Sequence, residues 1–113
     1  MTDAQAPILF DPARVVRNRN RAAHRYHDSA FLKQRESEHL VERLADVSRR
    51  FANALDLGSH DGTAARALAA SGQVDAVTAY ESASAMVEAA RASGVEVVAG
   101  DAETLPFEPG TFD

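Results

Sequence analysis

Acidic side chains end three successive apolar segments of the chain. Asp56 follows ANAL, Glu81 follows VDAVTAY and lies 25 residues after Asp56, and Asp101 follows VEVVAG. If the segments are parallel strands, their carboxyl ends meet at one edge of a sheet, where open α/β folds bind ligands. A carboxylate there accepts hydrogen bonds from ribose hydroxyls or from an adenine amino group. Acidic groups also favour a bound cation where water is partly excluded.

A glycine-containing turn follows Asp56. It reads GSHDG, from Gly58 to Gly62, and glycine at both ends lets a ligand approach the backbone closely. Ser59 offers a further polar contact. The glycine spacing differs from the G-x-G-x-x-G pattern of pyrophosphate-binding turns, which disfavours a nicotinamide-dependent oxidoreductase. If the middle of the turn needs a positive φ, His60 is tolerated there but costs more than glycine would.

Strands and helices are expected to alternate around these residues. Strands are predicted for ANALDLG, VDAVTAYE and VEVVAGD, and helices for TAARALAAS and SAMVEAARAS, closed by Gly72 and Gly94. The fold class is therefore α/β, with a parallel sheet that we expect helices to cover on both faces. Phe112 and Asp113 have the pattern of the first residues of a fourth strand.

Two helices are predicted ahead of the strands. The first spans 10–27, with Asp11 as its cap and Pro12 at its first position. The second spans 29–50 and ends on Arg49 and Arg50. Its expected apolar stripe consists of Phe31, Leu32, His39, Leu40, Leu44 and Val47.

Composition narrows the possible functions. The chain of 113 residues has no cysteine, so disulfides, thiolate catalysis and zinc–thiolate sites are excluded. No segment is apolar enough for a membrane span, and the opening residues do not form a signal peptide, so we expect a cytoplasmic protein. The four histidines lack metal-ligand spacing, and the prediction is that no metal is bound.

Charge divides the chain in two. Residues 1–51 carry a formal charge of +3 and residues 52–113 a charge of −8. The basic half contains acids and few aromatic residues, so we interpret it as a solvated helical face and expect no nucleic-acid partner.

Two motifs resemble class I S-adenosylmethionine-dependent methyltransferases. LDLGSHDG is similar to their D-x-G-x-G-x-G motif, and GDAETLPFEPGTFD to the segment before their fourth strand. The resemblance implies a Rossmann-like methyltransferase fold and S-adenosyl-L-methionine as cofactor. It places Asp56, Gly58 and Gly62 at the methionine end, Glu81 at the ribose, and Asp101 with Ala102 at the adenine. It identifies no catalytic residue.

The front arm, from LFDPARVV to VSRRF, resembles the methyltransferase-like family of complex I assembly factors, implicated in arginine hydroxylation. It is also similar to the malonyl carrier-protein methyltransferase of biotin synthesis. The resemblance implies a protein substrate, either a respiratory complex subunit or a carrier protein. The alternative is a non-catalytic or hydroxylase-type assembly factor that retains the cofactor pocket.

The expected organisation is an N-terminal helical arm over 1–51 and the N-terminal part of a cofactor-binding domain over 52–113. We expect the chain to stop before strand four. On that basis it should be an inactive, marginally stable fragment whose first strand forms an open edge, in the order three, two, one, four.

Overall fold

The computed structural model describes residues 11–29 and 31–113, without the side chains of residues 24 and 26–29. The side chains of His24 and His27, two of the four histidines, therefore lie outside what the structure describes. Helices α1 (Pro12–Ser29) and α2 (Phe31–Ala45) come first. The Asp11 carboxylate accepts hydrogen bonds from the amides of Ala13 (3.0 Å) and Arg14 (3.4 Å). The predicted cap at Asp11 and start at Pro12 are thus confirmed.

Three parallel strands alternate with two further helices, as the sequence predicts. Strand β1 (Phe51–Leu57), helix α3 (Thr63–Ala70), strand β2 (Val74–Glu81), helix α4 (Ser84–Ala92) and strand β3 (Val97–Ala99) follow in that order. The sheet order is β1-β2-β3, and both pairings are parallel. The predicted α/β class and Rossmann-like strand order are present.

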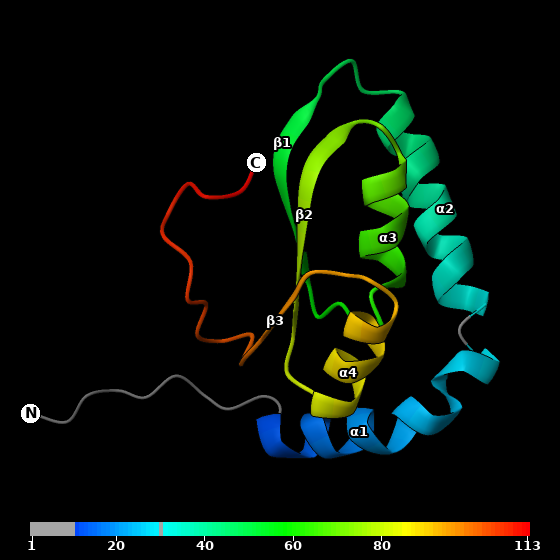
Figure 1. Ribbon diagram of the computed structural model, residues 1–113, viewed down its shortest axis with the longest axis vertical. Helices are drawn as coiled ribbons and strands as arrows, with labels where there is room; N and C mark the ends of the chain where they lie inside the picture. The colour runs from blue at the N-terminus through cyan, green and yellow to red at the C-terminus, as the bar shows by residue number, and fades with distance from the viewer. Residues whose placement is uncertain (1–10, 30) are drawn as a thin grey trace, which may run out of the picture.

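The expectation that helices cover both sheet faces is wrong for the described residues. Helices α3 and α4 lie on one face, with α2 outside α3 and α1 across the end of α4, while the segment after β3 runs along the opposite side (Figure 1). The cause is topological. Two right-handed crossovers that step in the same direction across a sheet place their helices on the same face.

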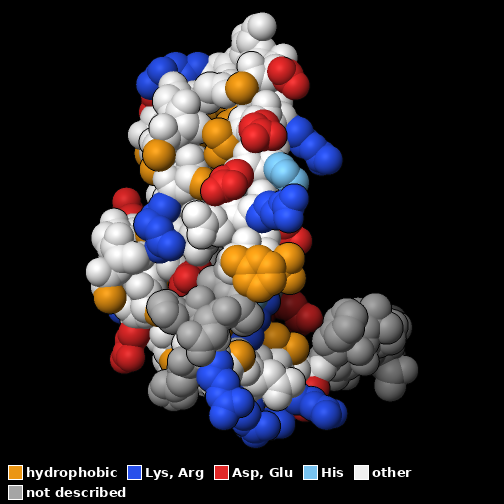
Figure 2. All heavy atoms as spheres, turned by 90° about the vertical axis from the view of Figure 1, so that its right-hand side faces the viewer, with side chains coloured by type: hydrophobic (Ala, Val, Ile, Leu, Met, Phe, Trp, Pro, Cys, Tyr) orange, Lys and Arg blue, Asp and Glu red, His pale blue; other side chains and the backbone are white. Residues whose placement is uncertain are grey.

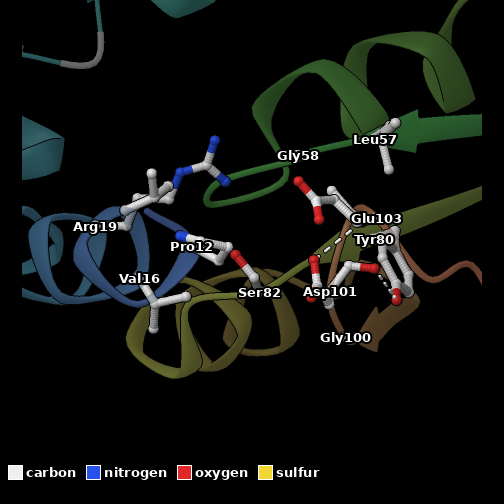
Figure 3. A pocket seen from close by; sticks show the side chains of 12 residues that line it. Pro12, Val16, Arg19, Leu57, Gly58, Tyr80, Ser82, Gly100, Asp101 and Glu103 are labelled. Atoms are coloured by element: carbon white, nitrogen blue, oxygen red, sulfur yellow. Dashed lines mark hydrogen bonds between the residues drawn. The ribbon is translucent and has the colours of Figure 1, made fainter. Parts of the chain in front are cut away.

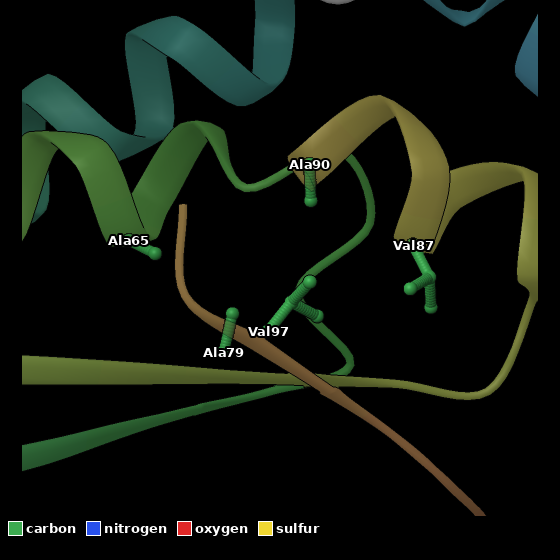
Figure 4. Close-up of a cluster of buried hydrophobic side chains, with 5 residues drawn as sticks. All are labelled: Ala65, Ala79, Val87, Ala90 and Val97. Atoms are coloured by element: carbon green, nitrogen blue, oxygen red, sulfur yellow. The ribbon is translucent and has the colours of Figure 1, made fainter. Parts of the chain in front are cut away.

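Small side chains build the core between the sheet and its helices. Ala65, Ala79, Val87, Ala90 and Val97 form one buried cluster (Figure 4). Because alanine side chains are small, the helices can pack close to the strands.

The apolar stripe predicted for the second helix is not a buried face. Phe31, Leu32 and Leu40 are 65%, 58% and 47% exposed, and hydrophobic side chains lie open to view among charged ones on the face that α2 helps form (Figure 2). Ser37 is the buried residue of α2, and its hydroxyl donates to the Lys33 carbonyl at 2.7 Å. The small serine allows close packing on α3, which the hydropathy pattern does not reveal.

The predicted C-terminal end of this helix is also wrong. Helix α2 ends at Ala45, so Arg49 and Arg50 lie beyond its last turn. Arg50 instead pairs with Asp75 at the start of β2, and its Nη2 lies 2.5 Å from the carboxylate. The Arg49 guanidinium stacks 4.7 Å from the centre of the Phe51 ring.

The outer edge of β1 carries an extended contact from the last residue. The Asp113 amide donates to the Asn53 carbonyl at 2.8 Å, and the Asp113 carboxylate accepts from the amides of Ala52 and Asn53 at 2.8 and 2.9 Å. Phe112 and Asp113 are not part of a strand in the structure, so the fourth strand stays a prediction. In the described part of the chain, no helix is long and apolar enough to cross a membrane.

Candidate functional site

A cavity of about 300 Å³ lies beyond the carboxyl ends of the strands, between α1 and the loop after β3 (Figure 3). It is lined by backbone and side chains from four parts of the chain. Helix α1 contributes Pro12, Val15, Val16 and Arg19; β1 and its turn contribute Leu57 and Gly58; β2 and its exit contribute Tyr80 and Ser82; the β3 loop contributes Gly100, Asp101, Ala102 and Glu103. Three of the predicted site residues, Gly58, Asp101 and Ala102, are thus brought to one hollow.

Glu81 ends β2 directly behind this cavity, and its side chain is fully buried. Its Oε1 accepts from Arg19 Nη1 at 2.7 Å and from the His60 amide at 2.9 Å. Its Oε2 accepts from the amides of Ser82 (3.0 Å) and Ala83 (2.8 Å), just before α4. Burial alone would raise the pKa of Glu81, but the amides of Ala83 and His60 and the Arg19 guanidinium together hold it below its ordinary range.

The turn after β1 needs the left-handed backbone that the sequence suggested. Gly58 has φ 70°, and His60 has φ 52°, the single described residue other than glycine with positive φ. This conformation aims the His60 amide at Glu81. Burial, with the nearby Arg19 guanidinium, lowers the pKa of His60 and so favours the neutral imidazole.

Asp56, near the end of β1, and Ser59, within the turn, do not line the cavity. Asp56 was expected to be the last residue of β1, but the strand continues to Leu57, so Asp56 is its penultimate residue. Its Oδ2 and the Ser59 Oγ are buried and have no hydrogen-bond partner among the described residues. Burial raises the pKa of Asp56, against the opposing effects of Lys33 and His60.

Two glycines of the motifs are required by packing. Gly62 has φ 85°, and a Cβ added to it would lie 2.8 Å from Val95 Cγ2. A Cβ on Gly100 would lie 2.1 Å from the Tyr80 hydroxyl. Gly62, predicted to line the methionine end of a cofactor, therefore sits against β3's entry loop, away from the cavity.

The loop after β3 forms the far wall. Asp101 follows the end of β3 at Ala99 by two residues and is exposed. The Tyr80 hydroxyl lies 2.8 Å from the Asp101 carbonyl and 3.1 Å from the Thr104 carbonyl, and can donate to either. Phe107 packs edge-to-face against Tyr80, with ring centres 5.7 Å apart. Phe107 is half-buried, and its ring packs on the tyrosine that holds the loop.

Arg19 and Asn20 are site residues that the sequence analysis missed. Arg19 reaches from α1 into the cavity, so the solvated face expected for the arm is wrong at this position; its side chain is 28% exposed. Asn20 Oδ1 accepts from the Ala85 amide at 2.9 Å, at the start of α4. Nothing in the basic run distinguishes Arg19 from its neighbours Arg17 and Arg21, because the partner is 62 positions away in sequence.

Across the described ranges, no group of three or more histidine, cysteine or acidic side chains is placed to hold a metal ion.

Known proteins share this architecture. No curated protein matches the chain in sequence. A solved complex of the Haloferax volcanii Trm112 methyltransferase activator with a protein assigned as a methyltransferase is similar at a TM-score of 0.68 and 23% identity, over 84% of this chain and 44% of that one. A Bacillus halodurans protein assigned as a methyltransferase is similar at a TM-score of 0.54 and 30% identity, over 66% of this chain and 34% of that one. The DhpI–SAM–HEP complex is similar at a TM-score of 0.60 and 26% identity, over 83% of this chain and 45% of that one.

The chain spans less than half the length of each of these solved proteins. The family model described as a methyltransferase domain matches residues 54–113, which include the turn, the end of β2 and the loop after β3. That match covers more than half of the sequence, and the chain therefore belongs to the methyltransferase domain family.

Proposed function

We propose that this chain is the cofactor-binding part of a class I S-adenosyl-L-methionine-dependent methyltransferase acting in the cytoplasm. The observation that carries the proposal is the hollow at the sheet's carboxyl edge, where the Gly58 turn faces Asp101 and Ala102 with Glu81 behind. Family membership and the cofactor-containing DhpI complex support it.

The residues present fit such a cofactor. A Cβ on Gly58 would meet nothing within 4 Å except the Arg19 side chain, at 3.6 Å, so the space over this backbone is filled only by a movable group. Asp101 lines the hollow, and the carboxylate of Glu81 is buried behind it. S-adenosyl-L-methionine, when bound, supplies a methyl group on a positively charged sulfur.

In this proposal the role of the chain is to bind the cofactor and to orient it. Gly58 provides a surface without a side chain, Glu81 accepts a hydrogen bond from one ribose hydroxyl, and Asp101 with the backbone at Ala102 accepts and donates to the adenine edge. Asp56, Ser59 and Gly62 act indirectly, because they lie outside the cavity wall and fix the shape of the turn. Transfer in such enzymes depends on alignment of acceptor and donor, and no proton-transfer residue is assigned.

Calorimetric titration with S-adenosylhomocysteine tests the proposal. We expect binding by the chain, and about tenfold weaker binding after Asp101→Ala, because a hydrogen bond to a charged group is lost. Asp75→Asn is the matched control, since Asp75 lies at the opposite end of β2. Absence of binding, or tight binding of NADH in a fluorescence titration, would reject the proposed cofactor.

The proposal also includes the methyl acceptor, which we expect to be a protein. The arm's resemblance favours a carrier protein or a respiratory complex subunit. Pull-down of either class by the chain, measured with and without α1, tests the prediction, and equal recovery without α1 would argue against it.

A second candidate is an assembly module that does not transfer methyl groups. Two observations favour it: His60 occupies the middle glycine position of the motif, and Arg19 fills the space over Gly58. Binding to a respiratory subunit without any heat on addition of cofactor would favour this candidate.

A further inference from the structure

The carboxylate of Glu81 has no free acceptor position. A carboxylate offers about four lone-pair sites, and four donors occupy them: the Arg19 guanidinium and the amides of His60, Ser82 and Ala83. Three of these donors are backbone groups fixed by the turn and by the approach to α4. A ligand hydroxyl can bind Glu81 only where a donor leaves.

Arg19 is the donor that can leave. It is a long side chain, it is 28% exposed while Glu81 is fully buried, and a rotation about its own bonds removes it without moving a strand. The guanidinium also lies over Gly58, with Nη2 3.6 Å from the position of an added Cβ. Figure 3 shows Arg19 pointing from α1 towards Gly58 across the mouth of the cavity.

We propose that Arg19 competes with the ligand for Glu81: the guanidinium occupies an acceptor position on Oε1 until a ribose hydroxyl displaces it. The inference rests on the proposed function, because it assigns the displaced position to the sugar of an adenosyl ligand. Every ligand that uses Glu81 must first break the Arg19 contact. The measured affinity is then the intrinsic affinity reduced by the fraction of molecules with Arg19 withdrawn.

Removal of Arg19 keeps the acceptor intact. In Arg19→Met the three amides still surround Glu81, and the apolar stem of the side chain is retained. The position on Oε1 that Arg19 Nη1 occupied is then open to another donor. The variant should therefore bind a ribose diol more tightly, whereas a ligand without the diol gains nothing from the vacated position.

The test is a calorimetric comparison of adenosine and 2′,3′-dideoxyadenosine on the full chain and on Arg19→Met. We expect about tenfold tighter adenosine binding by the variant, since a charge-assisted hydrogen bond no longer opposes it, and unchanged binding of the dideoxy ligand. Arg21→Met, an exposed arginine of the same helix, is the matched control and should bind both ligands as the parent chain does.

The ratio of the two affinities is measured within one protein, so a partly unfolded variant still gives a valid result. Equal tightening of both ligands would show that Arg19 merely fills space and would overturn the proposal. Unchanged or weaker adenosine binding would overturn it as well, while leaving the proposed function in place. If adenosine binds neither protein, the proposed function itself fails.

Discussion

Glu81 and Asp56 lie close to the same turn, and burial acts to raise the pKa of both, yet the two pKa values shift in opposite directions. Glu81 is surrounded by donors, whereas Asp56 Oδ2 has none among the described residues. One carboxylate is therefore stabilised as an anion, and the other favours its proton. Both residues are visible in the sequence as strand-end acids, but their different surroundings are not.

Replacement of Glu81 should show its role in stability. Glu81→Gln puts an amide N–H₂ group against donors, and we expect a loss of about 3 kcal/mol in unfolding free energy near pH 7, within the range for a broken buried pair. Urea denaturation measures it. Glu88→Gln, on the exposed side of α4, is the control, and equal losses in the two variants would contradict the assignment.

The lowered pKa of Glu81 also fixes a pH dependence. Because the folded-state pKa is below the ordinary value of 4.5, the stabilising contribution is present above pH 4.5 and is lost as the pH falls through the folded-state pKa. The parent chain should lose more stability than Glu81→Gln over that acidic range. Parallel curves for the two proteins would show that Glu81 is not the titrating group.

The contribution of Asp56 to stability should change with pH in the direction opposite to that of Glu81. Its raised pKa means that its contribution is complete below the ordinary value of 3.8 and is lost as the pH rises through the folded-state pKa. Asp56→Asn removes this titration, so the variant should gain stability relative to the parent as the pH rises. Denaturation across pH 3 to 8 checks it, with Asp46→Asn in the exposed turn after α2 as the control.

At the scale of elements, local sequence signals account for most of the arrangement. Strand β2 has the predicted bounds, and α3 and α4 end near the predicted glycines Gly72 and Gly94. Alternating short apolar runs and alanine-rich segments carry this information locally. The buried face of α2 could not be predicted, because it depends on how closely Ser37 approaches another helix.

Gly62 offers a test of how closely the turn before α3 packs against the loop before β3. Gly62→Ala should cost about 3 kcal/mol, since it adds a clash with Val95 to a strained positive φ. Gly72→Ala is the matched control: its φ is 79° with nothing within 4 Å of an added Cβ, and about 1 kcal/mol is expected from the backbone alone. Thermal melts measure both, and Val95→Ala should partly rescue Gly62→Ala.

At the scale of the whole molecule, the basic arm is joined to the acidic sheet unit at the site. Adjacent residues of α1 make the two contacts: Arg19 binds Glu81, and Asn20 caps α4 through the Ala85 amide. The charge asymmetry of the sequence predicts attraction between the halves. It does not predict which arginine meets which acid, because that depends on the docking of α1.

The Asn20 contact can be tested apart from the ion pair. Asn20→Ala should lower the unfolding free energy by about 1 kcal/mol, as for a lost helix cap, and speed hydrogen exchange at the Ala85 amide. Asn18→Ala, on the exposed side of the same helix, should change neither. Slow exchange at Ala85 in Asn20→Ala would mean that α4 is capped by another group.

Tyr80 is an intrinsic fluorophore in the wall of the cavity. The chain has no tryptophan and two tyrosines, and the ring of Tyr80 forms part of the cavity wall while its hydroxyl lies against backbone carbonyls. A nucleoside that enters the hollow changes the polarity and quenching around this phenol. Ultraviolet emission of the unlabelled protein should therefore follow occupancy of the cavity directly, with Tyr80→Phe identifying the share of signal that comes from this ring.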